Sequence, residues 1–373
     1  MLLHIRTFIK QETVLVLAFI LAICSCFIVH PDKEYISYID THTLLILFCL
    51  MAVMAGFKSL GLFQFIGEAL IKRFHTTRGL VFVLVFLCFF SSMFITNDVA
   101  LITFVPLALL ILSKTGMGFA VCFVVTLMTI AANLGSMLTP VGNPQNLYLY
   151  STSGMSLIDF LLLMLPYTIM AATLLIICIC IYYKPLAING CKFDSESIID
   201  WKKVIYYLIL FLLCLLCVVD VLSVELLFII ILLAVGLENR SLLKEVDYSL
   251  LATFVCFFVF TGNIGRIEAF NSLIMSILDS HVIPVSIALS QIISNVPAAL
   301  LLSGFTDAYS KLIIGTNLGG LGTLIASMAS LISNQQVVVQ YPASKKYYFV
   351  LFTVWNVIFL ILLSGLVFVL DSI

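Results

Sequence analysis

The chain of 373 residues carries very little charge. Asp, Glu, Lys and Arg together make up 10% of it, against about a quarter in an ordinary soluble domain. Apolar residues make up 63%, and many stand in runs long enough to cross a bilayer. This composition excludes a soluble globular protein and predicts an all-α polytopic membrane protein in the cell membrane, with lipid as its main surroundings. The formal net charge of −1 also argues against a nucleic acid partner.

Clusters of catalytic or metal-binding side chains are also missing from the sequence. The five histidines lie at the ends of apolar runs or in loops, without ligand spacing. The eleven cysteines lie mostly inside apolar runs, where cysteine behaves as a small hydrophobe. Cys214 and Cys217 have a redox spacing but no polar neighbour. We therefore expect no enzymatic activity and no resident cofactor.

What the chain does contain is a pair of polar motifs that occurs twice. Thr96-Asn97-Asp98 is followed by a polar stretch over 133–146, and Ser294-Asn295-Val296-Pro297 is followed by a similar stretch over 317–330. Asn133, Leu134, Gly135 and Thr139 match Asn317, Leu318, Gly319 and Thr323 at a constant spacing. Gly- and Pro-rich polar breaks at matching places in two apolar halves are the best sequence signal for the binding site of a secondary transporter.

The apolar runs predict about nine membrane crossings and two re-entrant hairpins. The crossings are expected at roughly 12–30, 42–57, 118–149, 157–183, 203–221, 223–237, 249–262, 311–333 and 346–370. Regions 79–112 and 283–305 are each split by a motif, and we expect each half to be too short or too interrupted to cross alone. Non-helical backbone at membrane depth is tolerated only beside protein or a water-filled cavity. The two hairpin tips, which carry the motifs, are therefore predicted to face a site.

The two halves of the chain are predicted to form an inverted repeat. Residues 44–56 match 250–262 in character, and an odd number of predicted crossings separates them, so the halves should run in opposite directions. The first repeat is placed at 1–200, with the inner hairpin 79–112 and the broken helix 118–149. The second is placed at 201–373, with an extra span, the outer hairpin 283–305 and the broken helix 311–333. Segments 61–74 and 265–280 mix charged and apolar residues, which predicts interfacial helices, with ordinary loops as the alternative.

The distribution of charge predicts the orientation. With a cytoplasmic N-terminus, the following basic residues fall inside: His4, Arg6, Lys10, Lys58, Lys72, Arg73, Arg78, Lys114, Lys184, Lys192, Lys202, Lys203, Arg240, Lys244, Lys345 and Lys346. The predicted outer loops carry mainly acids, namely Asp32, Glu34, Asp159, Asp220 and Asp371, against Lys33, Arg266 and Lys311. This bias predicts a cytoplasmic N-terminus and an extracytoplasmic C-terminus.

The tips and breaks supply side-chain oxygens, freed carbonyls and helix N-termini, which suit a hard cation and an anion. The candidate residues of the first half are Thr96, Asn97, Asp98, Asn133, Ser136, Thr139, Asn143 and Asn146. Those of the second half are Ser294, Asn295, Thr316, Asn317, Thr323, Ser327 and Ser330. Two possible Na⁺ sites are Thr96, Asn97 and Asn143, and Ser294, Asn295 and Asn317. The alternative for such side chains is that they only tie helices together.

Asp98 is the only carboxylate in a hairpin tip, because the matching position of the second tip is Val296. An acid inside the membrane is a functional candidate by default. Asp98 could coordinate a cation, carry a proton or cap the half-helix whose first turn it occupies. The sequence leaves these three roles open.

The motifs resemble those of the ion transporter superfamily, which includes divalent-anion:sodium symporters and arsenite permeases. The resemblance covers roughly 40–370 and is closest to bacterial anion permeases with a citrate-transporter-like domain. It implies secondary active transport of a small anionic solute, a carboxylate or an oxyanion, coupled to Na⁺ or H⁺. It also implies a homodimer with an elevator-like moving domain. The alternatives are a sodium/proton antiporter with Asp98 as its exchanging group and, less favoured, an ion channel.

In the dicarboxylate branch of that superfamily, each tip reads Ser-Asn-Thr. There the Ser and Asn bind sodium and substrate, and the Thr contacts a substrate carboxylate. Thr96-Asn97 and Ser294-Asn295 keep the first two positions, whereas Asp98 and Val296 replace the third. The resemblance therefore implies the same ion-binding tips with a different contact to the solute.

Overall fold

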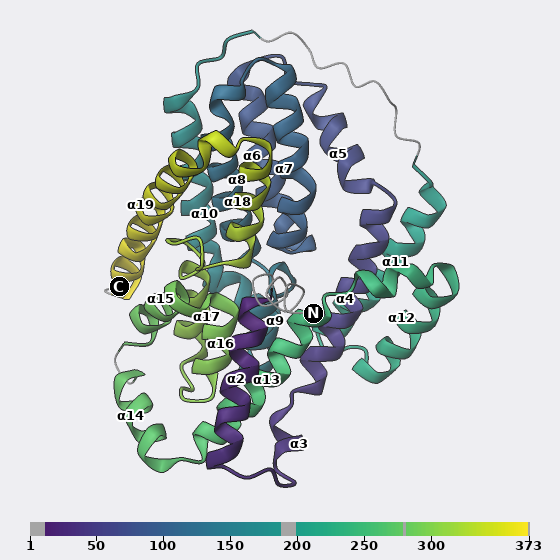
Figure 1. The fold of residues 1–373 in the computed structure, drawn as a ribbon. Helices are drawn as coiled ribbons and strands as arrows, with labels where there is room; N and C mark the ends of the chain where they lie inside the picture. The colour runs from purple at the N-terminus through teal and green to yellow at the C-terminus, as the bar shows by residue number, and fades with distance from the viewer. Residues whose placement is uncertain (1–11, 188–198, 279–280, 372–373) are drawn as a thin grey trace.

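The computed structural model describes residues 12–187, 199–278 and 281–371. The basic residues His4, Arg6, Lys10 and Lys192, the end of the predicted segment 265–280 and the extreme C-terminus lie outside these ranges. Apart from one isolated bridge between Thr76 and Ala187, the secondary structure of the described residues is helical. The prediction of an all-α polytopic membrane protein is confirmed (Figure 1).

The first part of the chain forms the helices that surround the first motif pair. They are α2 (Thr13–Ile28), α3 (Tyr35–Tyr38), α4 (Thr41–Ser59), α5 (Leu62–Ile71), α6 (Thr77–Ile95), α7 (Asn97–Lys114), η1 (Gly118–Ala120), α8 (Val121–Ser136), η2 (Pro140–Gly142), α9 (Pro144–Ser153) and α10 (Leu157–Tyr182). The predicted interfacial segment 61–74 contains the short helix α5.

The second part contains α11 (Trp201–Val218), α12 (Val224–Glu238), η3 (Arg240–Glu245), α13 (Tyr248–Gly265), α14 (Glu268–Leu278), α15 (Val282–Ile293), α16 (Asn295–Ser303), α17 (Tyr309–Leu318), α18 (Met328–Gln340), η4 (Pro342–Ser344) and α19 (Lys345–Asp371). The predicted segment 265–280 contains α14. Both expected breaks are present, because α8 stops before α9 and α17 stops before α18.

Eight helices within the described ranges are long and apolar enough to cross a membrane, or nine if the bent pair α14–α15 counts as one span. The individual spans differ from the prediction. The helices α6 and α7 have 19 and 18 residues, or about 27 Å each at 1.5 Å per residue, so the expectation that neither half of 79–112 could cross alone was wrong. The helices extend past both predicted ends of that region. Conversely, α2 has only 16 residues, fewer than predicted for 12–30, while α12 has 15 residues, as many as predicted for 223–237.

The helices α4 and α13 run in opposite directions. Tyr38, just before α4, packs so closely on Gly262 near the end of α13 that a Cβ atom there would lie 2.4 Å from its ring. At the other ends, Lys58 of α4 lies 3.6 Å from Glu245, shortly before α13. In Figure 1, α5, α6 and α7 accordingly lie toward the upper end of the molecule, whereas α14, α15 and α16 lie toward the lower end.

Each hairpin packs on the first part of a broken helix through a glycine. A Cβ atom on Gly135 of α8 would lie 2.0 Å from the carbonyl oxygen of Phe89 in α6. A Cβ atom on Gly319, which follows α17, would lie 2.5 Å from the hydroxyl of Ser290 in α15. Only glycine permits this approach, and it brings the two hairpin tips beside the two breaks.

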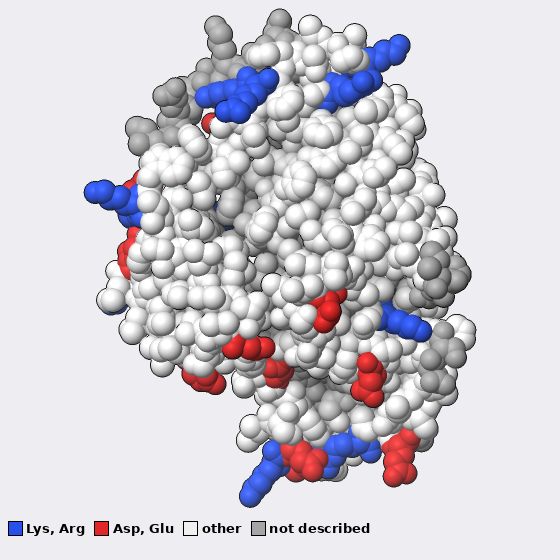
Figure 2. Space-filling view, turned by 180° about the vertical axis from the view of Figure 1, so that it is seen from behind, with Lys and Arg blue, Asp and Glu red and all other residues white. Residues whose placement is uncertain are grey.

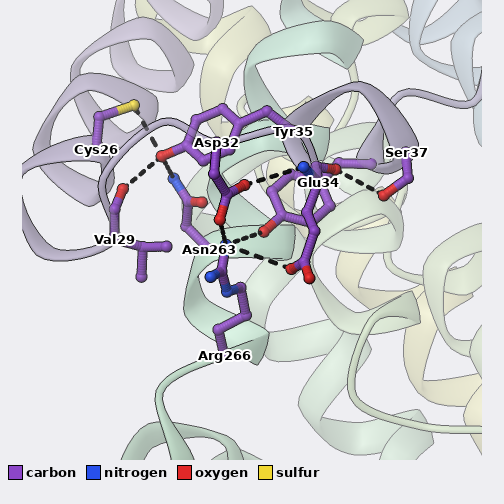
Figure 3. Close-up of polar contacts among 9 residues, drawn as sticks. Cys26, Val29, Asp32, Glu34, Tyr35, Ser37, Asn263 and Arg266 are labelled. Carbon is purple, nitrogen blue, oxygen red and sulfur yellow. Dashed lines mark hydrogen bonds and ion pairs between the residues drawn. The ribbon is translucent and has the colours of Figure 1, made fainter.

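The loop after α2 is fastened to the end of α13 by a polar cluster (Figure 3). Arg266 Nη1 lies 2.8 Å from Asp32 Oδ2 and 3.4 Å from Glu34 Oε2, and it donates to the hydroxyl of Tyr38. The amide of the buried Asn263 donates to the Tyr35 hydroxyl at 2.8 Å. The hydrogen bond to Arg266 lowers the pKa of Asp32 below its usual range.

Charged side chains gather at the two ends of the molecule. Arg78, Lys114 and Lys345 stand at helix ends that meet at the upper end of Figure 1, where α6 begins, α7 ends and α19 begins. Figure 2 shows Lys and Arg at this upper end, while most Asp and Glu on that face lie in the lower half. The upper end is therefore the more basic of the two on this face.

Candidate functional site

Both hairpin tips turn at a single residue with the same unusual backbone. Thr96 has φ 65° and ψ 151°, and Ser294 has φ 76° and ψ 156°. This region is strongly disfavoured for residues with a side chain and costs about 1–3 kcal/mol, so the surrounding structure must hold it in place. Asn97 and Asn295 follow as the first residues of α7 and α16. The two motifs thus have matching conformations.

The two breaks arise from helix-breaking residues. Pro140 and Pro144 bracket the chain between α8 and α9, and Asn143 caps α9 by accepting a hydrogen bond from the Asn146 N–H at 3.1 Å. Gly322, with φ 104°, lies in the break between α17 and α18. Each break exposes a helix end close to the tips.

Asparagines tie each broken helix to the other. In α8, Asn133 Oδ1 accepts hydrogen bonds from Asn97 Nδ2 at 2.9 Å and from the hydroxyl of Ser327, at the start of α18, at 3.0 Å. In α17, the Asn317 amide bonds Asn143 at 3.3 Å and Asn146 at 2.6 Å, both at the start of α9. The start of α9 in the first half therefore bonds the asparagine of α17, and the start of α18 in the second half bonds the asparagine of α8.

Two adjoining cavities lie beside the tips. The smaller one, here called the tip cavity, has a volume of about 220 Å³. Its polar wall includes residues of both tips and both breaks, namely Asn97, Asp98, Gln145, Ser294, Asn295 and Ser327. The larger one, the side cavity, has a volume of about 430 Å³ and is lined by Thr96, Asp98, Asn143, Lys58, Glu245 and Asp247, among others. Asp98 lines both.

The cavities are electrostatically negative. Glu12, Asp98 and Asp247 line the tip cavity, and none of its described lining residues is Lys, Arg or His. In the side cavity, the single Lys58 lies 3.6 Å from Glu245. Asp98 Oδ1 is buried and has no hydrogen-bond partner among the described residues. An unpaired carboxylate in such a place favours a bound cation or a proton.

The structure brings seven of the predicted site residues to the cavities, namely Thr96, Asn97, Asp98, Asn143, Ser294, Asn295 and Ser327. Behind them lie three asparagines whose hydrogen bonds tie the two broken helices together, namely Asn133, Asn146 and Asn317. The two proposed Na⁺ sets are therefore divided. In the first set, Thr96 and Asn143 line the side cavity, whereas Asn97 lines the tip cavity. In the second set, Ser294 and Asn295 line the tip cavity, whereas Asn317 lies behind it.

Three predicted threonines bond backbone carbonyls instead. Thr316 donates to Leu312 O within α17 at 2.8 Å. Thr139 donates to Met93 O, and Thr323 donates to Gln291 O, so each fastens a break to the last turn of the neighbouring hairpin helix. These contacts are structural and place the three hydroxyls against the backbone.

Two glutamines were missed by the sequence analysis. Gln145 lies inside the first break motif, is 1% exposed and lines the tip cavity. Gln291 of α15 donates to Gly319 O at 3.0 Å and to Leu321 O at 2.9 Å, and it accepts from Thr323 N at 2.9 Å. An amide three residues before the Ser294 tip, in an otherwise apolar helix, was the signal available for Gln291.

The sequence matches a known family and named proteins. Residues 2–311 match the family described as citrate transporter. An uncharacterized transporter of Methanocaldococcus jannaschii is 36% identical over 82% of this chain and 83% of that protein. The inner membrane protein YbiR of Escherichia coli is 31% identical over 83% of both. A silicon efflux transporter of Oryza sativa is 32% identical over 46% of this chain and 35% of that protein.

These similarities place the chain among membrane transporters, as its motifs predict, and they confirm the expectation that it is not an enzyme.

Proposed function

Because the chain belongs to the citrate transporter family, we propose that it is a secondary active transporter of a small anionic solute, coupled to Na⁺ or H⁺. The observation that carries the proposal is the convergence of two matching hairpin tips and two helix breaks on the tip cavity. Tips and breaks of this kind present backbone and amide groups to a solute at the centre of a transporter. The solute is a carboxylate or an oxyanion.

The charge of the cavities supports coupling to a cation. An anion that entered the tip cavity alone would meet Asp98 and Asp247 without a basic partner in the described wall. A cation or proton that binds first cancels the charge of Asp98 and removes the repulsion. Ordered binding, with the cation first and the solute second, follows from this arrangement.

The opposite directions of α4 and α13 and the matched tips support an inverted-repeat transporter with two hairpins. In such a protein, the hairpins and broken helices move as one body past the remaining helices. We include an elevator-like movement and a homodimer in the proposal, both on the strength of the motif resemblance. Crosslinking of single cysteines placed on α4 and α7, in the presence and absence of solute, tests the movement.

The transport proposal is tested by counterflow in proteoliposomes that contain the purified full-length protein. Vesicles loaded with unlabelled citrate, malate or phosphate are diluted into the labelled compound with Na⁺ or K⁺, at several pH values. A transporter gives saturable uptake with a transient overshoot and a dependence on Na⁺ or pH. Flux that rises linearly with concentration and shows no overshoot would instead identify a channel.

The acidic wall of the tip cavity favours a second candidate, a sodium/proton antiporter. In that case Asp98 would bind Na⁺ and H⁺ in turn, and no organic or oxyanion solute would be needed. The two functions are separated in vesicles that contain a pH-sensitive dye. A pulse of Na⁺ without any solute moves protons in the antiporter and leaves the internal pH unchanged in the symporter.

A further inference from the structure

We propose that Gln145 binds the solute in the tip cavity, and that its amide selects acids that carry an O–H group over anions that carry none. The selected class comprises hydroxy acids and partly protonated oxyacids. This inference rests on the proposed transport function and adds to it the chemistry by which the tip cavity recognises its solute.

Gln145 is a buried amide with no hydrogen bonds. Its side chain is 1% exposed, and neither Nε2 nor Oε1 has a partner among the described residues. An unsatisfied polar group in a protein interior is destabilising, so such groups are rare unless they bind water or a ligand. Gln145 lines the tip cavity beside Asn97 and Asn295. A solute in that cavity therefore lies beside a residue whose amide has both of its hydrogen-bonding groups unused.

The position of Gln145 is fixed by its neighbours. Pro144 precedes it at the start of α9, and Asn143 caps the helix. Asn146 follows it and accepts a 2.6 Å hydrogen bond from Asn317 of α17. The backbone that carries Gln145 is thus held on both sides, which leaves the amide pre-positioned for recognition.

The free groups of the cavity wall define what a ligand must offer. Asp98 is occupied by the cation or proton that binds first, so Gln145 supplies the unused groups, one acceptor, Oε1, and a donor group, Nε2. A fully deprotonated anion without a hydroxyl offers acceptors alone, so it can satisfy Nε2 but not Oε1. A solute with an O–H group satisfies both kinds.

The remaining wall does not supply a competing anion site. Its described charged residues are Glu12, Asp98 and Asp247, all acidic. Within the described part of the wall, recognition therefore rests on hydrogen bonds rather than on a basic side chain. Sites built to bond a hydroxyl discriminate strongly against the analogue that lacks it, because their own polar groups are then left unpaired.

The test uses pairs of solutes that differ by one hydroxyl. Malate and succinate, citrate and tricarballylate, and lactate and propionate compete with the labelled solute in the counterflow assay, and hydrogenphosphate is compared with sulfate at pH 7. In the wild-type protein, the hydroxyl-bearing member of at least one pair is expected to compete at about tenfold lower concentration or better. Gln145→Met keeps the length of the side chain and removes its donor and acceptor, so it should bring this ratio close to one. Gln340→Met, at the exposed end of α18, is the matched control and should keep the wild-type ratio.

Equal competition within every pair in the wild-type protein would overturn the inference while leaving transport intact. Retention of the wild-type ratio in Gln145→Met would also overturn it. If that variant does not fold, Gln145→Ala replaces it. This change removes both the donor and the acceptor of the amide, and it should bring the ratio close to one while the protein elutes as the wild type does. A complete lack of saturable uptake would instead defeat the transport function, and this inference with it.

Discussion

Asp98 is the residue on which the coupling proposal depends most. Its Oδ1 is buried without a partner among the described residues, and it lines both cavities. Among the described residues, no backbone N–H donates to the Asp98 carboxylate, and the N–H of Asp98 itself donates to Asn97 Oδ1 at 3.0 Å. Asp98 therefore does not cap α7 through a hydrogen bond, and only its charge can interact with the dipole of that helix. A cation or proton role accounts better for a carboxylate in this position.

Asp98→Asn removes the charge and keeps the shape. We expect the dependence of uptake on Na⁺ or pH to weaken by about tenfold or more, with a smaller change in apparent solute affinity, because one charge-stabilising contact is lost. Uptake is measured against Na⁺ concentration and against pH, with Asp307→Asn, in the loop before α17, as the control. An unchanged cation dependence would leave Asp98 with the helix-dipole role alone.

Asn97 and Asn295 are expected to be equivalent. Both are 5% exposed, both follow a residue with positive φ, and both line the tip cavity. Asn97→Ala and Asn295→Ala should each reduce uptake at least tenfold, while gel filtration shows an intact protein. Asn356→Ala, a buried amide in α19, serves as the control for removal of a buried asparagine. Near-normal transport by both tip variants would contradict the assignment of the tips.

At the scale of single residues, the sequence could predict which residues form the tips. It could not predict which of the other polar residues line a cavity and which bond one another. Thr96, Asn97, Ser294 and Asn295 were recognisable because they interrupt apolar runs. Whether an asparagine lines a cavity or bonds another asparagine depends on contacts between residues far apart in the chain. Asn133 and Ser327, 3.0 Å apart, are an example. Gln145 lies within the polar stretch 133–146, but only its lack of partners among the described residues distinguishes it.

Among the elements, the break after α17 is bonded to α15 through the side chain of Gln291. Gln291 bridges α15 to Gly319, Leu321 and Thr323, whereas the first break is fastened to α6 by the Thr139 bond to the backbone of Met93. Gln291→Leu leaves these backbone groups unpaired, which costs about 1–3 kcal/mol for each group that water does not reach. We expect a lower melting temperature and reduced uptake. Met93→Leu, a volume-conserving change, should affect both less. A wild-type melting temperature for Gln291→Leu would show that the break is held by other contacts.

The loop between α2 and α4 depends on the ion pair between Asp32 and Arg266. Because the pKa of folded Asp32 is lowered, the pair stabilises the protein above the carboxyl's unfolded pKa, near 4. This stabilisation is lost as the pH falls through the lower folded-state pKa. Asp32→Asn should therefore melt below the wild type at pH 7, and the difference should shrink as the pH falls below about 4. The more exposed and more distant Glu34 gives the control, since Glu34→Gln should change the melting temperature less. A difference between Asp32→Asn and the wild type that does not vary with pH would contradict this account.

The apolar runs predicted which segments form helices, and the Pro and Gly residues predicted where helices break. The lengths of the helices could not be predicted. The apolar pattern did not show that α6 and α7 each extend far enough to reach from one end of the molecule to the tip. Their length is supported by packing on α5 and α8, which the sequence does not display. The short α2 shows the converse, since its run of apolar residues set only an upper limit on the helix.

At the scale of the whole molecule, the two ends differ in charge on the face that Figure 2 shows. The loop between α7 and α8 and the turn between α18 and α19 lie at the upper end of Figure 1, while α3 and α14 lie at the lower end. The closeness of these two upper connections is supported by the packing of α8 against both α18 and α19. Basic residues at the upper end favour its placement in the cytoplasm.

This orientation is tested by labelling single cysteines, in a variant without native cysteines, with a reagent that does not cross the membrane. Cysteines at Gly116 and Ala343 should be protected in intact cells and become labelled after lysis. Cysteines at Ser37 and Asp307 should be labelled from outside, because α3 and the loop between α16 and α17 lie at the acidic end. A reporter fused to the C-terminus should report an extracytoplasmic location, since α19 starts at the basic end and runs toward the other. Labelling of Gly116 and Ala343 from outside, with Ser37 and Asp307 protected, would invert the molecule. Mixed labelling within either pair would mean that the helices do not cross as their ends in the structure require.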